Sequence, residues 1–139
     1  MQLIANTSNV IYYNPATDPY SDAATGSGGT WNGELGATLQ SVIGNANYDI
    51  GHLFGASGGG GNAGCIGCVC SADNSKGTGF TSPGDGIPQG DNFDIDYVAH
   101  EIGHQLGGNH TFSMSTENNA VNMEPGSGVT IMGYAGITG

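Results

Sequence analysis

The chain has 139 residues and a formal net charge of −11, because twelve acidic side chains are opposed by a single basic one, Lys76. This length predicts one modest domain and is too short for two ordinary ones. The acidic balance argues against binding to nucleic acid or to an anionic membrane surface. The sequence lacks the run of ~18 apolar residues that a membrane span requires.

The N-terminal part of the chain predicts two strands and a helix. Residues 9–13 are β-branched and aromatic and run into Asn-Pro, which favours a strand followed by a turn. Apolar residues at helical spacing predict a short helix over 34–43. Alternation of apolar and polar residues predicts a second strand over 48–54, in which we interpret His52 as a core histidine.

The middle of the chain is rich in glycine and contains all three cysteines. A run of four glycines precedes a predicted third strand of small residues, 65–71. With no fourth ligand at similar spacing, a disulfide is favoured over a metal cluster, and the odd count leaves at least one thiol free or paired outside this chain. We expect Cys65 to pair with Cys68 or Cys70. A long loop is predicted over 75–92.

The clearest helical pattern follows this loop. Asp91 or Asp94 can cap its start, and the paired glycines Gly107 and Gly108 favour a left-handed exit at its end. The apolar residues that fall on one face of this helix are Ile95, Val98, Ala99, Ile102 and Leu106.

A candidate metal site lies at the end of this helix. His100 and His104 are four residues apart, which places both imidazoles on one helix face, and Glu101 is placed to act as a general base. A sharp turn at Gly107 can bring His110 back as a third ligand. Three neutral imidazoles with one open position are typical of a catalytic zinc site rather than a structural one.

These residues match the motif His-Glu-x-x-His-x-x-Gly-x-x-His at every defined position, and the sequence therefore resembles the metzincin zinc endopeptidases. The resemblance implies an α+β fold: a zincin-like catalytic domain with a small mixed β-sheet, an active-site helix and a Met-turn. It implies that residues 1–139 are one such domain, incomplete at both ends. It also implies Zn²⁺ as cofactor, held by His100, His104 and His110, and hydrolysis of peptide or protein substrates with Glu101 as the base.

Residues downstream extend the resemblance. Met132 matches the methionine that forms an apolar floor beneath the metal in this clan, and Tyr134 is spaced like a tyrosine that assists catalysis in astacins and serralysins. Residues 48–52, the glycine run and residues 124–128 look more like secreted bacterial proteins of reprolysin-like type, which implies an extracellular location. Thr111 matches neither the Asp of animal reprolysins nor the Glu of astacins.

Two other functions compete with the protease. The first is a catalytically inactive zinc-binding or adhesion module of a larger secreted protein. The second is a calcium-binding domain, although the spacing of the aspartates does not match an EF-hand loop, and an accessory Ca²⁺ is compatible with the protease as well. The aspartates concerned are Asp85, Asp91, Asp94 and Asp96.

Overall fold

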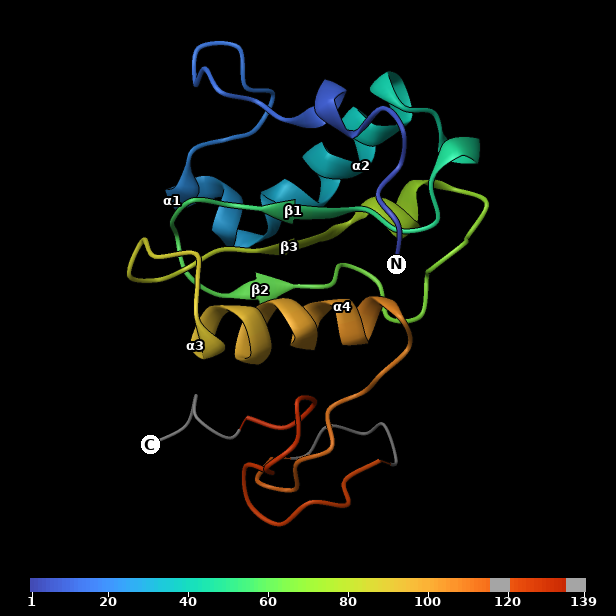
Figure 1. The fold of residues 1–139 in the computed structure, drawn as a ribbon. Coiled ribbons are helices and arrows are strands. Elements are labelled where there is room, and N and C mark those ends of the chain that lie inside the picture. The colour runs from blue at the N-terminus through green and yellow to red at the C-terminus, as the bar shows by residue number, and fades with distance from the viewer. Residues whose placement is uncertain (116–120, 135–139) are drawn as a thin grey trace.

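The structure is a computed structural model that describes residues 1–115 and 121–134 (Figure 1). Its helices and strands are α1 (Ala23–Thr25), α2 (Trp31–Val42), β1 (His52–Phe54), β2 (Gly61–Asn62), β3 (Gly79–Thr81), α3 (Asp91–Phe93) and α4 (His100–Gln105). Single 3₁₀ turns occupy Thr7–Val10, Asn45–Asn47 and Asn74–Gly77, and π-helical stretches occupy Gly26–Thr30 and Asp94–Ala99. The second π-helical stretch joins α3 to α4, so residues 91–105 run as one helix, which we call helix 91–105.

Three strands form a small mixed sheet in the order β1-β3-β2. β1 is parallel to β3, with Leu53 opposite Phe80, and β2 is antiparallel to β3, with Asn62 opposite Phe80. Figure 1 shows α2 on one side of the sheet and helix 91–105 on the other, next to β2. The chain after this helix lies beyond it, on the side away from the sheet. The α+β fold class is therefore confirmed.

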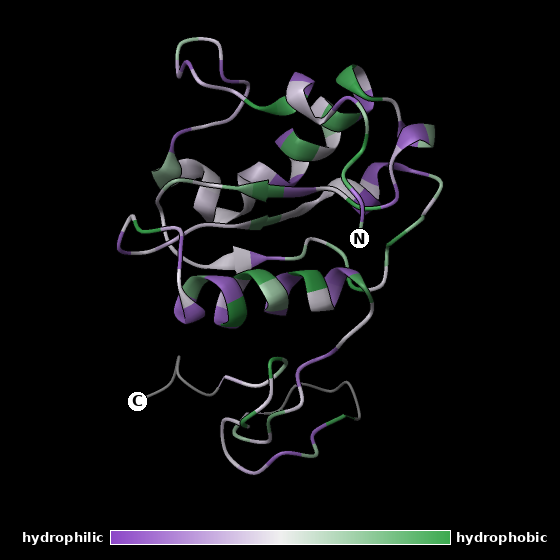
Figure 2. Ribbon diagram, in the orientation of Figure 1, coloured by the Kyte–Doolittle hydropathy of each residue, from purple (hydrophilic) through white to green (hydrophobic). Residues whose placement is uncertain are grey.

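The main core lies between α2 and the sheet. Its buried apolar side chains are Leu35, Leu39, Ile43 and Tyr48, and the ring of Trp31 meets that of Phe80 edge-on at 5.4 Å between centroids. Figure 2 shows several apolar residues along α2. The predicted helix over 34–43 is confirmed, although it begins earlier, at Trp31, and the chain leaves it at Gly44 with a φ of 84°.

A buried polar network joins helix 91–105 to the sheet. The amide nitrogen of Gln105 donates to the carbonyl of Gly51 at 2.8 Å, which turns its Oε1 toward Nδ1 of His52, also at 2.8 Å. Nε2 of His52 lies 2.7 Å from the hydroxyl of Thr81. Burial lowers the pKa of His52, so the neutral ring is favoured. The histidine in the predicted strand is therefore a structural residue.

The prediction of a strand over 9–13 is wrong. A 3₁₀ turn ends at Val10, and although Ile11 is extended (φ −103°, ψ 114°), this segment has no ladder partner among the described residues. Tyr13 remains 90% exposed. Residue preference alone does not make a strand, since its stability comes from pairing and burial. The second predicted strand, 48–54, is shorter than expected and begins at His52.

The predicted strand over 65–71 is also wrong, and a disulfide turn takes its place. Cys65 and Cys68 are bonded, with their Cα atoms 5.7 Å apart, while Cys70 is free and exposed. Residues three apart on a strand would be separated by roughly 10 Å, so the bond and a strand exclude each other. The expected pairing of Cys65 with one of the other two cysteines is confirmed.

The predicted loop over 75–92 contains the central strand of the sheet. β3 is only three residues long and fully buried, so no alternation of apolar and polar residues marks it in the sequence. Its Gly79 lies against helix 91–105, where a β-carbon would be 2.5 Å from the side-chain carbon Cδ of Gln105. Gly79 lies in a segment that the sequence predicts to be a loop. In the structure it belongs to a strand and allows that strand to approach the helix closely.

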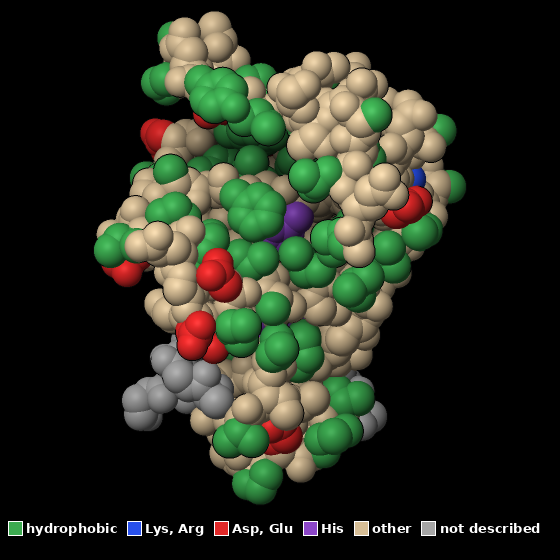
Figure 3. Space-filling view, in the orientation of Figure 1, with side chains coloured by type: hydrophobic (Ala, Val, Ile, Leu, Met, Phe, Trp, Pro, Cys, Tyr) green, Lys and Arg blue, Asp and Glu red, His purple; other side chains and the backbone are tan. Residues whose placement is uncertain are grey.

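The face of helix 91–105 that is buried differs from the predicted apolar one. Ile95 and Leu106 are 43% and 57% exposed, and Figure 3 shows apolar side chains gathered across this view of the molecule. The buried residues are Phe93, His100, Glu101, His104 and Gln105. His100, His104 and Gln105 are buried together with hydrogen-bond partners, which makes the burial of these polar side chains favourable. No described helix is long and apolar enough to cross a bilayer.

At the start of the helix, the N-cap residue is Gly90 rather than an aspartate. Asp94 reaches back from the first turn, and its Oδ2 accepts a hydrogen bond from the backbone N–H of Gly90 at 3.1 Å. Of the two predicted capping residues, Asp94 therefore contributes to the helix start, although from inside the helix.

Candidate metal centre

Three histidine side chains converge beside helix 91–105. His100 and His104 project from consecutive turns and are 3% and 6% exposed, and their Nε2 atoms lie 3.1 Å apart. The Nε2 atom of His110 lies 3.1 Å from that of His100 and 3.0 Å from that of His104. Among the described residues, this is the one group of three or more His, Cys, Asp or Glu side chains close enough to hold a metal ion.

The turn at Gly107 brings the third histidine to the other two. Its φ is 108°, a left-handed conformation that glycine adopts without strain. The backbone N–H of Gly107 donates to the carbonyl of His104 at 2.9 Å, and that of Gly108 donates to the carbonyl of Gly103 at 2.8 Å. These bonds close the helix C-terminus and reverse the chain toward the imidazoles. The helix therefore ends where the sequence predicts, and the chain brings His110 back to the other two histidines as expected.

Backbone carbonyls orient two of the imidazoles. Nδ1 of His100 lies 2.6 Å from the carbonyl oxygen of Ile131, and Nδ1 of His104 lies 2.7 Å from that of Gly108. Because a carbonyl oxygen only accepts hydrogen bonds, each Nδ1 carries the proton, and each Nε2 presents its lone pair to the centre of the cluster.

The cluster fits a zinc ion. Lone pairs of nitrogens only 3.0–3.1 Å apart repel one another unless a cation lies between them. Nitrogens bonded to one zinc at about 2.0–2.1 Å with tetrahedral angles are roughly 3.4 Å apart, which is close to the spacing seen here. The three imidazoles would hold the ion, and the cleft lies beside two of them, His104 and His110.

Glu101 lies next to the cluster, between the helix and the edge strand β2. The side chain is only 8% exposed, and burial raises its pKa from 4.5 to about 7. A β-carbon at Gly61 would be 2.5 Å from Cγ of Glu101, so the strand packs directly on the carboxyl group. Only a residue without a side chain allows this contact.

Met132 contacts the helix at Gly103, one residue before His104. Its sulfur packs against Gly103, where a β-carbon would be 2.6 Å away. The carbonyl of Met132 accepts a hydrogen bond from the N–H of Thr111 at 3.2 Å. The ring of Tyr134 lies 4.8 Å from that of His110 and 5.7 Å from that of His100, centroid to centroid. The two downstream residues singled out in the sequence thus lie beside the cluster.

The carboxylate of Glu124 joins the chain after His110 to the chain before Met132. It accepts hydrogen bonds from the hydroxyls of Thr111 and Thr130 and from the backbone N–H groups of Val129 and Thr130 at 2.7 and 3.1 Å. The hydrogen bond from Thr111 leads those that lower the pKa of Glu124 to about 2. Thr111, which matches neither family's acidic residue, therefore has an acidic partner from elsewhere in the chain.

A cleft of about 320 Å³ opens beside His104 and His110. Its walls come from β2 and the chain that follows it, from the helix, and from the C-terminal segment. The lining residues are Gly61, Asn62, Ala63, Gly64, Cys65, Ile66, Glu101, His104, His110 and Tyr134.

The family model for M12B metallopeptidases of reprolysin-like type matches residues 1–139. The chain belongs to this reprolysin-like metallopeptidase family. No curated protein and no solved structure matches it. Family membership, together with the three histidines, supports a metalloprotease whose site suits zinc and whose substrates are peptides or proteins.

The histidines and Glu101 of this reprolysin-like chain could be located from the sequence, but the residues that support them could not. Glu124, Gln105 and Gly61 act through contacts with distant parts of the chain, and no local pattern marks them. The four aspartates considered for calcium form no metal-binding group in the described part of the chain. Asp85 and Asp94 instead accept hydrogen bonds from nearby backbone N–H groups, those of Ile87 and Gly90.

Proposed function

We propose that the chain is a zinc-dependent endopeptidase in which His100, His104 and His110 bind the metal. The observation that carries this proposal is the convergence of three Nε2 atoms, two of them with lone pairs directed inward by backbone carbonyls, at the wall of an open cleft. When bound, zinc would polarise the scissile carbonyl and lower the pKa of a water molecule to roughly 7.

Glu101 would serve as the general base and then as the general acid. Its carboxyl group faces the same cleft as His104 and His110, and burial brings its pKa to about 7, near the pH at which the reaction would run. A divalent cation on the neighbouring histidines would favour the ionised form and lower that pKa. The carboxylate would take a proton from the attacking water and pass it to the departing amine.

Tyr134 and Met132 would have supporting roles. The phenol of Tyr134 lines the cleft beside His110, where its hydroxyl could donate a hydrogen bond to the scissile carbonyl oxygen as negative charge develops there. Met132, with its sulfur against Gly103, would form the apolar support beneath the imidazoles that the Met-turn provides in this clan.

The substrate would bind along the edge strand β2. This strand lines the cleft and lies at the edge of the sheet, so an extended peptide could add to it as an antiparallel strand. The strand predicted over 65–71 is replaced by the disulfide turn, so the expected contact with the peptide is at residues 61–66. The disulfide also supports a secreted protein, since such bonds persist in oxidising compartments.

The decisive experiment compares metal content and cleavage of a quenched peptide library by the wild-type chain and Glu101→Ala. Zinc near one per chain, chelator-sensitive cleavage and a loss of roughly 10²-fold or more in Glu101→Ala would support the proposal. Asp96→Asn is the matched control, because this carboxylate is on the same helix but does not line the cleft. We expect it to retain both zinc and activity.

The possible results separate the competing functions. Zinc without cleavage by the wild-type chain would favour the inactive zinc-binding module. Zinc with full activity in Glu101→Ala would remove Glu101 from the mechanism. Absence of stoichiometric zinc binding would overturn the proposed site.

A further inference from the structure

The disulfide turn after β2 is attached to the helix that carries the metal ligands. Cys65 and Cys68 close a turn with Gly67 inside it, and the φ of Gly67 is 74°. The backbone N–H of Gly67 donates to the carbonyl of His104 at 2.9 Å, and that of Val69 donates to the carbonyl of Gln105 at 3.3 Å. The disulfide therefore restrains the shape of the turn, and the hydrogen bonds to the end of the helix hold the turn beside the metal centre.

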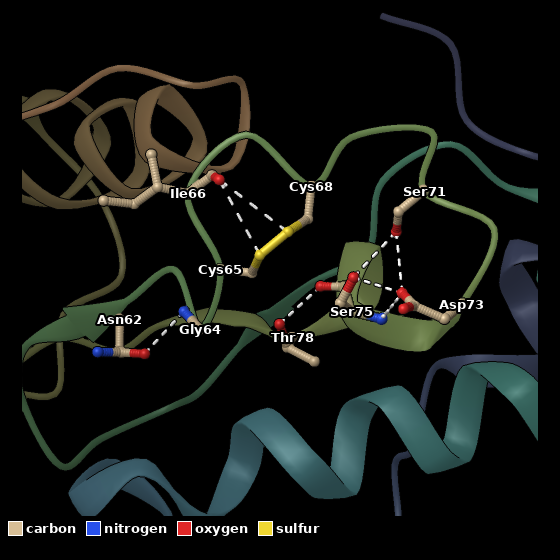
Figure 4. Close-up of a disulfide and its surroundings, with 9 residues drawn as sticks. All are labelled: Asn62, Gly64, Cys65, Ile66, Cys68, Ser71, Asp73, Ser75 and Thr78. Atoms are coloured by element: carbon tan, nitrogen blue, oxygen red, sulfur yellow. Dashed lines mark hydrogen bonds between the residues drawn. A yellow bond between two sulfur atoms is a disulfide. The ribbon is translucent and has the colours of Figure 1, made fainter.

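Ile66 lies inside this turn and lines the cleft. Its side chain is 49% exposed, and it shares the cleft with Glu101, His104 and Tyr134. Figure 4 shows the side chain pointing away from the two sulfur atoms. An apolar side chain held half-exposed at the wall of a polar cleft is suited to contact an apolar group of a ligand.

The direction of β2 determines which part of a peptide would reach Ile66. Glu101 packs against Gly61, at the start of the strand, and the chain then runs past Asn62 and Ala63 toward Ile66. A peptide bound antiparallel to this segment has its N-terminal residues near Ile66 when its scissile bond lies near Glu101. The turn therefore faces residues on the amino side of the cleaved bond.

We propose that Ile66, positioned by the Cys65–Cys68 disulfide, is a specificity-determining residue that selects apolar side chains on the amino side of the scissile bond. The inference rests on the proposed function for the placement of the peptide. The described cleft lining contains no Lys or Arg, and the chain has a net charge of −11, so acidic side chains at this position are disfavoured as well.

The binding of peptide hydroxamates tests this inference without any measurement of peptide cleavage. Acetyl-dipeptide hydroxamates bind a metal through their C-terminal group, so their side chains extend only to the amino side. On the zinc-loaded wild-type chain, we expect a leucine-containing probe to bind about tenfold more tightly than its aspartate counterpart. In Ile66→Ala this ratio should fall toward one, and in Ile66→Lys it should reverse, while acetohydroxamate binds all three chains equally.

A second set of variants tests the role of the disulfide. Cys65→Ala/Cys68→Ala should keep zinc and acetohydroxamate binding but lose most of the preference for leucine, because the turn is no longer closed. Cys70→Ala is the matched control, since Cys70 is exposed and outside the disulfide, and it should behave as wild type.

The two proposals fail in different ways. An unchanged ratio of leucine to aspartate binding in both Ile66 variants would overturn the role of Ile66, whether or not the chain cleaves peptides. A ratio that depends on Ile66 in a chain without peptidase activity would support the binding preference and contradict the proposed catalysis. If the zinc-loaded wild-type chain does not bind acetohydroxamate, both the role of Ile66 and the proposed function are contradicted.

Discussion

At the scale of single residues, Glu124 shows how a charge can support the three-histidine cluster without being part of it. It binds Thr111, which follows His110, and the backbone of Val129 and Thr130, which precede Met132. Hydrogen bonds to the ionised form of a carboxylate stabilise that form, and its pKa falls to about 2 as a result. The fold therefore depends on this side chain being charged.

We predict that Glu124→Gln lowers stability in a pH-dependent way. The pKa falls from 4.5 in the unfolded chain to about 2 in the folded one, so the stabilisation is complete above about pH 4.5 and is lost as the pH falls through about 2. The urea midpoints of wild type and variant should differ most above pH 5 and converge near pH 2.

Asp49→Asn serves as the control for this measurement, because Asp49 is an exposed carboxylate on another part of the surface. Its midpoint should follow that of the wild type throughout. A constant gap between wild type and Glu124→Gln from pH 2 to pH 6 would show that shape, and not charge, accounts for the effect of Glu124.

At the scale of elements, the end of helix 91–105 determines whether the metal centre forms. An α-helix continued past residue 106 would carry His110 away from its partners, and the left-handed turn at Gly107 prevents this. The same turn places Gly108 so that its carbonyl orients His104. One glycine thus positions the third ligand and orients the second.

We predict that Gly107→Ala weakens zinc binding at least tenfold. An alanine at a φ of 108° costs about 1–2 kcal/mol, and relief of this strain shifts the path of the chain to His110. Zinc affinity measured by competition with a chromogenic chelator would show the loss. Gly86→Ala is the matched control, because its φ is also positive, at 74°, and a β-carbon there would meet nothing within 4 Å. Equal zinc affinity in the two variants would contradict the prediction.

The elements that could be predicted from the sequence are those with local causes. Helix α2 and the end of helix 91–105 follow from apolar spacing and from glycine, and the histidines converge because helical spacing and one turn bring them together. β3 was missed because its position depends on partners distant in the chain. The pairing of Cys65 was expected, but the strand predicted over the same residues is replaced by a turn because the bond joins residues only three apart. Gly79, for example, lies in a strand because it pairs with His52 of β1, and as a glycine it also allows Gln105 to pack against it.

The buried face of helix 91–105 was missed for a related reason. Apolar spacing points to the face with Ile95 and Leu106, but both are largely exposed, whereas Gln105 is 1% exposed. The burial of a polar side chain is favourable only when its hydrogen bonds are satisfied, as those of Gln105 are by Gly51 and His52. These partners are distant from Gln105 in the chain, so the apolar periodicity of the helix does not reveal them.

At the scale of the whole molecule, the surface charge is almost entirely negative. The only cationic side chain among Lys and Arg, Lys76, is 7% exposed. Its ammonium group donates to the carbonyl of Asn45 at 2.7 Å and lies 4.8 Å from the centre of the Tyr48 ring. Figure 3 accordingly shows several acidic side chains and a single small patch of lysine. The charge of Lys76 is therefore buried within the fold and does little to offset the negative charge of the surface.

We predict that added salt stabilises the zinc-loaded chain. Folding brings the acidic groups that give the net charge of −11 closer together, and their repulsion is screened as the Debye length falls from ~30 Å at 0.01 M to ~10 Å at 0.1 M. Between 10 and 200 mM NaCl, a gain of about 1 kcal/mol would raise the melting temperature by roughly 4 °C. The rise should level off at higher salt, because the charges are then already screened.

Sucrose at equal osmolality is the control, since its exclusion from the surface adds stability steadily with concentration. A melting temperature that stays flat or falls with NaCl would mean that the acidic groups are neutralised by another route, and bound cations would then be the first to examine.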